Sequence, residues 1–195
     1  MRLSHGSGRG AHYRNAIGII SLKLNFKVEG IERMHEEKHI LTMLVDNEPG
    51  VLSRVVGLFS ARGYNIESLV VAPTIDPLVS RITLVTNANL PEIEQIEKQL
   101  RKLINVIKLR DLSGKNAVKR EMALICVKAK PENRAEVLRI VSIFRCKVVD
   151  TGLEHYIIEV SGNEDKINAF INLLKPMGIK KFARTGALAL FREPN

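Results

Sequence analysis

One stretch of the sequence, DNEPGVLSRVVGLFSARGYNIESL at residues 46–69, combines residue types that could hold a small ligand. A Pro-Gly pair precedes a run with helical spacing, and the free backbone N–H groups at a helix N-terminus favour a carboxylate. Gly50 has no Cβ, so another molecule can approach its N–H closely. Asn47 offers a donor and an acceptor to a group that carries both an ammonium and a carboxylate. With Val51 and Leu52 as an apolar wall, the stretch suits a free amino acid with an aliphatic side chain.

A structural interpretation explains the same residues equally simply. Pro49 and Gly50 can form an ordinary turn from a strand into a helix, and Asn47 can cap that helix. The residue types alone leave both interpretations open.

The rest of the chain offers no pattern for catalysis or metal binding. No nucleophile elbow, P-loop or dinucleotide-binding glycine motif occurs. Cys126 and Cys146 lack a positioned base, so we expect both to be small core residues. None of the histidines has ligand-like spacing to cysteines or carboxylates: His5, His12, His35, His39 and His155. We therefore expect no catalytic residue, no metal and no cofactor in this chain.

Net charge gives a weak argument for a nucleic-acid partner. The 195 residues include 30 Lys+Arg and 21 Asp+Glu, for a net charge of +9. Residues 1–36 carry six basic and three acidic residues, residues 37–112 nine of each, and residues 113–195 fifteen and nine. The strands expected at 39–45 and 80–86 lack the stacking aromatics of RNA-binding domains. We therefore predict no nucleic-acid partner.

Length and cysteine content restrict the class of protein further. No apolar run approaches the roughly 20 residues that cross a bilayer, so we predict no membrane partner. Two cysteines do not form a disulfide framework and fit a reducing compartment, so we expect a cytoplasmic protein.

The ligand-like stretch lies between well-patterned elements. HILTMLV, before it, reads as a buried strand, and apolar residues at helical spacing predict a helix from about Gly50 to Arg62. Two further strands flank a proline-containing turn, and a second helix opens at Pro91. The expected strands are 39–45, 64–72, 80–86 and 106–112, with Ile107 and Leu109 on one face of the last.

The same order of elements recurs in the second half. We predict strands at 122–129, 147–151 and 155–161, helices marked by Val137, Leu138, Val141 and Phe144 and then by Ile167–Leu174, and one or two closing strands. The fold class is α+β, with two tandem ferredoxin-like βαββαβ domains. They span residues 37–112 and 119–195, joined by a linker at 113–118. Residues 1–36 form an N-terminal extension, and Met34 is a candidate for the true start.

Several motifs extend this pattern into a family resemblance. In order they are NEPGVLSRV, GLFS, RGYNIESL, VAPT, SRITLVT, EQIEKQLRKLINV, KREMALICV, IFRCKVVD and ARTGALALFR. Over about residues 37–192 the sequence resembles the regulatory (small) subunit of acetolactate synthase, also called acetohydroxyacid synthase. That enzyme opens the biosynthesis of valine, leucine and isoleucine.

The resemblance implies an amino-acid-binding ACT domain at 37–112, followed by a second ACT-like domain. Two copies would form a homodimer through their ACT domains, with valine in the crevice between them. One chain would supply the first loop and helix start, and Asn65 and Ile66, on the second strand, would come from the partner chain. Pro49 would stiffen the loop. The implied valine-binding residues are Asn47, Pro49, Gly50, Val51, Leu52, Asn65 and Ile66.

The resemblance also implies a non-catalytic role. The chain would activate a separate large catalytic subunit and confer feedback inhibition by valine. Thiamine diphosphate, Mg²⁺ and FAD would belong to that catalytic subunit. The alternatives are a small stand-alone catalyst on this fold, and a stand-alone amino-acid-sensing or nucleic-acid-binding regulator.

Overall fold

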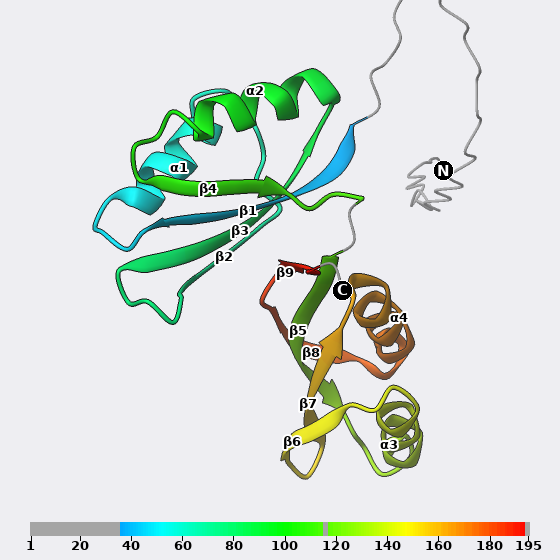
Figure 1. Cartoon of the computed structure of the whole chain (residues 1–195). Helices are drawn as coiled ribbons and strands as arrows, with labels where there is room; N and C mark the ends of the chain where they lie inside the picture. The colour runs from blue at the N-terminus through cyan, green and yellow to red at the C-terminus, as the bar shows by residue number, and fades with distance from the viewer. Residues whose placement is uncertain (1–35, 115–116, 194–195) are drawn as a thin grey trace, which may run out of the picture. The chain divides into compact units, whose positions relative to one another are not determined.

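A computed structural model describes residues 36–114 and 117–193 of the chain (Figure 1). Both ranges belong to one compact unit, Met34–Asn195. The interpretations of residues 1–35, including the candidate start at Met34, lie outside the described residues.

The first half folds into a four-stranded antiparallel sheet with α1 and α2 on one face (Figure 1). The strand order is β2-β3-β1-β4, so β2 and β4 are the edges. In chain order the elements are β1 (Glu37–Asp46), α1 (Val51–Ser60), β2 (Ser68–Pro73), β3 (Val79–Ala88), α2 (Leu90–Leu100) and β4 (Val106–Asp111).

The core of this half lies between the sheet and its helices. Alternate residues of β1 face the helices, as a strand pattern with period two requires. Phe59 of α1 and Ile96 of α2 are fully buried against Leu41 and Leu84 of the central strands. The apolar spacing that predicted both helices therefore corresponds to their buried faces.

The second half repeats this arrangement with strand order β6-β7-β5-β8 and helices α3 and α4 on one face. A last strand, β9, pairs with the first residues of β5. The elements are β5 (Ala117–Lys128), α3 (Arg134–Ile143), β6 (Lys147–Thr151), β7 (His155–Gly162), α4 (Glu164–Leu174), the 3-10 turn Lys175–Met177, β8 (Ile179–Arg184) and β9 (Leu188–Phe191). The predicted fold class, α+β with two tandem ferredoxin-like units, is confirmed.

Some predicted boundaries are wrong in the first half. The second strand begins at Ser68, not at residue 64, so Asn65 and Ile66 lie in the loop before β2. The carbonyl of Asn65 accepts a hydrogen bond from the Thr86 hydroxyl, and regular pairing with β3 starts at Ser68. Ile107 is exposed, unlike Leu109, because a bulge opposite Leu44 interrupts the alternation of β4.

Further differences occur in the second half. Ala117 and Val118, assigned to the linker, are the first residues of β5 because they pair with Phe191 and Leu190 of β9. On α3, Ile140 is buried and Leu138 is exposed. Among the described residues, the longest helices have 11 residues, and no helix is long and apolar enough to cross a bilayer.

The two halves share a small apolar core. Ile40 of β1 and Val85 of β3 point away from α1 and α2, and they pack with Leu112, Ala187 and Ala189. Leu112 and Ala189 are fully buried there.

Candidate functional site

The loop between β1 and α1 has a backbone that requires glycine. Gly50 has φ of +86°, in the left-handed region, where a Cβ is strained. A Cβ built at Gly50 would meet no atom within 4 Å, so the constraint is conformational and the space beside the residue is open. Gly50 is also the N-cap of α1.

The N-terminus of α1 has no side-chain cap. No side chain bonds to it, and its first turn has no acidic residue. The amide of Arg54 donates to the carbonyl of Gly50 at 3.0 Å, but those of Leu52 and Ser53 find no acceptor among the described residues. By contrast, Asn89 and Glu92 form a full capping box on α2. The α1 terminus therefore presents free N–H groups beside open space, an arrangement suited to a carboxylate.

Asn47 does not cap α1, so that part of the structural interpretation is wrong. Its Nδ2 donates to the carbonyl of Pro77 at 2.8 Å, and its backbone N–H donates to the carbonyl of Leu78 at 2.8 Å. Asn47 thus connects the loop before α1 to the turn between β2 and β3. Asn47 is exposed.

Asn105 anchors the same loop from the opposite side, a role that the sequence analysis missed. This buried side chain donates from Nδ2 to Asp46 at 3.0 Å and accepts from Arg54 Nη1 at 2.5 Å. The backbone carbonyl of Asn105 also accepts a hydrogen bond from the backbone N–H of Asp46 at 3.0 Å. The one available signal was a lone polar residue between Ile104 and Val106. Asn105 fixes the end of β1 to the first turn of α1.

Val51 and Leu52, which were predicted to form an apolar wall, differ in burial. Val51 is buried in the core, so its side chain does not form a wall beside Gly50. Leu52 is 40% exposed and is the aliphatic side chain that this helix start offers to a ligand. Pro49 is exposed in the loop before Gly50.

Asn65 and Ile66 are not brought together with Asn47 and Gly50 in one chain. The two sets flank opposite ends of α1, whose 10 residues span about 15 Å. Asn65 is exposed, whereas Ile66 is partly buried against the core. A site that uses both sets would need a second copy of the chain.

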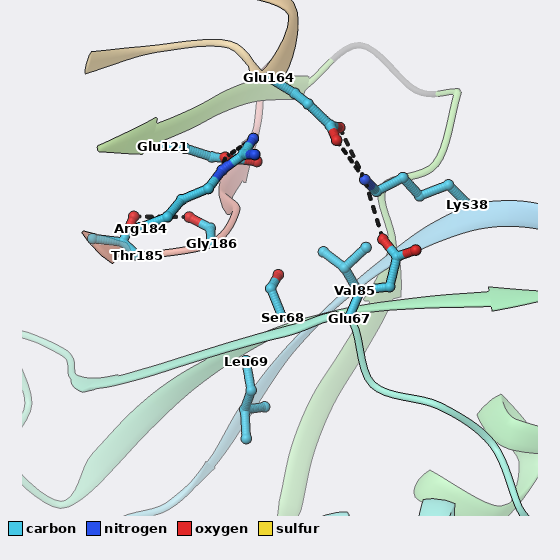
Figure 2. Close-up of a pocket in the computed structure, with 10 residues that line it drawn as sticks. All are labelled: Lys38, Glu67, Ser68, Leu69, Val85, Glu121, Glu164, Arg184, Thr185 and Gly186. Carbon is cyan, nitrogen blue, oxygen red and sulfur yellow. Dashed lines mark hydrogen bonds and ion pairs between the residues drawn. The ribbon is translucent and has the colours of Figure 1, made fainter. Parts of the chain in front are cut away.

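A cavity of about 390 Å³ lies elsewhere, between the start of β1 and the second half, and includes none of the predicted site residues. Figure 2 shows that its charged side chains face one another. Lys38 Nζ lies 2.8 Å from Glu164 and 3.2 Å from Glu67, and Arg184 pairs with Glu121. Because these charges are mutually paired, the loop before α1 is the better candidate for an amino-acid ligand.

Lys38 and Cys146 are among the groups outside the candidate loop whose pKa values are shifted. Burial alone would lower the pKa of Lys38, but its hydrogen bonds to Glu164 and Glu67 raise that pKa overall. Burial raises the pKa of the Cys146 thiol, and Lys166 only partly offsets this. Within residues 36–114 and 117–193, no three His, Cys, Asp or Glu side chains gather as metal ligands.

Comparison with known proteins adds independent information. Residues 41–108 match the family model "AHAS small subunit-like ACT domain", and residues 120–193 match "Small subunit of acetolactate synthase". The chain is 48% identical over 155 residues to a probable acetolactate synthase small subunit of Archaeoglobus fulgidus, covering 80% of this chain and 97% of that protein. It is 51% identical over 165 residues to the acetolactate synthase small subunit of Aquifex aeolicus, covering 84% and 85%.

A solved structure agrees with these matches. The crystal structure of the acetolactate synthase small subunit from Thermotoga maritima superposes with a TM-score of 0.75 at 41% identity. That match covers 82% of this chain and 99% of the other. The chain therefore belongs to the acetolactate synthase small-subunit family.

Proposed function

We propose that this chain is a non-catalytic regulatory subunit that activates a separate acetolactate synthase catalytic subunit and makes it sensitive to valine. Membership of the small-subunit family implies a catalytic partner. The observation that carries the choice of effector site is the uncapped N-terminus of α1 at Gly50. Thiamine diphosphate, Mg²⁺ and FAD are assigned to the catalytic subunit, and the expected compartment is the cytoplasm.

In this proposal the carboxylate of valine accepts hydrogen bonds from the free N–H groups of Leu52 and Ser53. The exposed amide of Asn47 binds the polar end of the ligand, and Leu52 contacts its aliphatic side chain. Asn65 and Ile66 of a second copy complete the site in a homodimer, which explains why one chain separates the two sets. One methylene in such a pocket is worth about 1–3 kcal/mol, so leucine and isoleucine are expected to act weakly.

Regulation then requires a coupling free energy between valine and the catalytic subunit, typically about 1–3 kcal/mol. Docking of this chain raises catalytic activity, and valine reverses part of that gain. Because binding couplings are reciprocal, the factor by which valine changes the affinity of this chain for the catalytic subunit is also the factor by which that subunit changes its affinity for valine.

The test compares Gly50→Asp with Gly50→Asn in the reconstituted enzyme. Both variants place a similar side chain at the strained φ, but only Asp puts a negative charge where the valine carboxylate is expected. Gly50→Asp should raise the valine concentration for half-inhibition at least about tenfold more than Gly50→Asn does, or about 1.4 kcal/mol. If both variants responded equally to valine, the assignment of the valine site to the N-terminus of α1 would be wrong.

Two controls separate the alternatives. The chain alone should form no acetolactate, and activity without the catalytic subunit would instead support a stand-alone catalyst. Salt-sensitive retention of DNA or RNA at micromolar protein would support a nucleic-acid-binding regulator.

A further inference from the structure

The face of the first sheet that points away from α1 and α2 carries three basic side chains, Arg81, Lys108 and Arg110, called the basic cluster below. Arg81 of β3 and Lys108 of β4 pair with Leu44 of β1 from its two sides. Arg110, two residues after Lys108, pairs with Thr42. Paired residues of neighbouring strands share a face of the sheet, so the three side chains stand close together. All three line one cavity of about 160 Å³.

The alternation of β1 shows that this face is the outer one. Leu41, Met43 and Val45 belong to the core beneath the helices. Thr42 and Leu44, which alternate with them, therefore point the other way, together with their partners on β3 and β4. The basic cluster is thus separate from the candidate valine site.

The basic cluster lacks a counter-charge in the described part of the chain. The ion pairs found there include none of its three members. Glu193 lines the same cavity, but it is exposed and forms no ion pair with the cluster. Like charges at neighbouring positions of a sheet repel one another. Arg81 is also only partly exposed, so water solvates its charge incompletely. An anion between the three side chains would remove both costs.

Two contacts hold the guanidinium groups of the cluster in place. Arg81 Nη1 donates to the hydroxyl of the buried Thr42 at 3.4 Å. The guanidinium carbon of Arg110 lies 5.3 Å from the centre of the Phe191 ring, a cation–π contact. Phe191 and Leu190, both from β9, also line the cavity. Positively charged groups that are already positioned lose less entropy when a ligand binds.

The charge and the size of the cavity restrict the class of ligand. A guanidinium binds the oxygen atoms of a carboxylate or a phosphate through two parallel hydrogen bonds, and a lysine adds a point charge. Three positive charges and the single negative charge of Glu193 leave an excess of two, which matches a dianion. The cavity is smaller than the roughly 300–1,000 Å³ of a pocket for a drug-sized molecule, so the ligand should be small.

We propose that Arg81, Lys108 and Arg110 form a binding site for a small dianion, either a phosphate or a dicarboxylate, on the outer face of the first sheet. The two guanidinium groups hold the oxygen atoms, and Lys108 balances the remaining charge. The inference goes beyond the proposed function and does not depend on it, because the site is defined without valine and without the catalytic subunit.

The test is calorimetric titration of the full chain at low ionic strength, with inorganic phosphate in one series and malonate in another. At least one of the two anions should bind saturably, with one anion per chain. The double variant Lys108→Gln/Arg110→Gln should weaken that binding at least about tenfold, since it removes two charged hydrogen-bond donors. Both side chains are exposed, so circular dichroism should match that of the unchanged chain. Each single substitution should weaken binding several-fold, which keeps the test valid if the double variant does not fold.

The control variant is Lys180→Gln/Lys181→Gln on β8. It removes the same net charge from exposed strand residues outside the cavity, and it should change the dissociation constant less than about twofold. Binding of phosphate alone or of malonate alone supports the site and identifies its ligand chemistry. Equal weakening by the two double variants would show general attraction to a basic chain and overturn the proposal. Absence of saturable binding for both anions would also overturn it, whatever the outcome of the valine experiments.

Discussion

Asn105 holds both flanks of the candidate loop and is itself buried. It is buried and bonded to Asp46 and Arg54, so it fixes the spacing between the end of β1 and the first turn of α1. The uncapped N–H groups depend on that spacing to point at a common space. Asn105 is therefore a positioning residue.

Substitution Asn105→Ala should weaken the response to valine. The change removes two side-chain hydrogen bonds and leaves the Asp46 carboxylate and the Arg54 guanidinium without this partner. We expect the unfolding free energy to fall by about 1–3 kcal/mol. We also expect the valine concentration for half-inhibition to rise several-fold, with maximal activation retained. Urea denaturation and inhibition assays of the reconstituted enzyme measure the two effects.

The matched control is Asn89→Ala, which removes a side chain of the same type that caps α2. Loss of an N-cap lowers the unfolding free energy by about 1 kcal/mol. Inhibition by valine should not change. If both variants shifted the half-inhibition concentration equally, the effect of Asn105 would be one of general stability.

At the scale of the element, the turn between β2 and β3, residues 74–78, is the part of the first half whose hydrogen bonds should respond to valine. Hydrogen exchange of residues 74–79 should change when valine binds, because Asn47 holds the carbonyls of Pro77 and Leu78. The turn between β6 and β7, which has no contact with Asn47, serves as the internal reference. Identical exchange of residues 74–79 with and without valine would show that the ligand leaves this contact undisturbed.

The sequence predicted the elements that carry a strong apolar pattern. β1 was recognised as a near-continuous apolar run, and α1 because residues such as Val55 and Phe59 repeat at helical spacing and are buried as expected. The fold class followed from the order of such elements. The loop before α1 was singled out because a Pro-Gly pair stands directly before a predicted helix, although the same pair is also compatible with an ordinary turn.

Features that depend on contacts between distant residues could not be predicted in this way. The start of β2 is set by pairing with β3, and Asn65 instead bonds through its carbonyl to Thr86. The alternation in the sequence places Ile107 on the same face as Leu109. Ile107 is nevertheless exposed, because a bulge in the pairing of β4 with β1 shifts the register there. Asn105 has no local pattern at all, since its partners are 51 and 59 residues away. The assignment of Asn65 and Ile66 to the valine site stays a prediction.

At the scale of the molecule, the ion pair of Arg184 and those of Lys38, all in the cavity of Figure 2, should differ in their contribution to stability. The Arg184–Glu121 pair is the more buried, whereas the side chains of Lys38, Glu67 and Glu164 are about 40% exposed. Glu121→Gln should lower the unfolding free energy by about 1–3 kcal/mol, because the partly buried Arg184 loses its counter-charge. Lys38→Met should change the free energy by less than about 1 kcal/mol. Similar losses in both variants, measured by urea denaturation, would contradict this ranking.

The pH dependence of the Lys38 contribution follows from its raised pKa. Since the folded pKa lies above the unfolded one, the contribution is complete below about pH 10.4 and is lost only as pH rises through the folded pKa. The difference in unfolding free energy between the unchanged chain and Lys38→Met should therefore be constant from about pH 6 to 9. A difference that disappeared within that range would exclude the lysine charge as its source.

The separation of Gly50 and Asn65 by the length of α1 has a genetic consequence. If each effector site draws on two chains, a mixed dimer of Gly50→Asp and Asn65→Ala chains carries both defects in one site and neither in the other. Random mixing of the two variants, neither of which binds valine alone, makes about half of the dimers mixed, and each mixed dimer has one intact site of its two. Valine binding should then return to about a quarter of the normal sites. Two alleles that each abolish feedback would complement one another in the same cell. Calorimetry of the mixed and re-equilibrated proteins detects this, and a mixture that binds no more valine than its two components would place each site within a single chain.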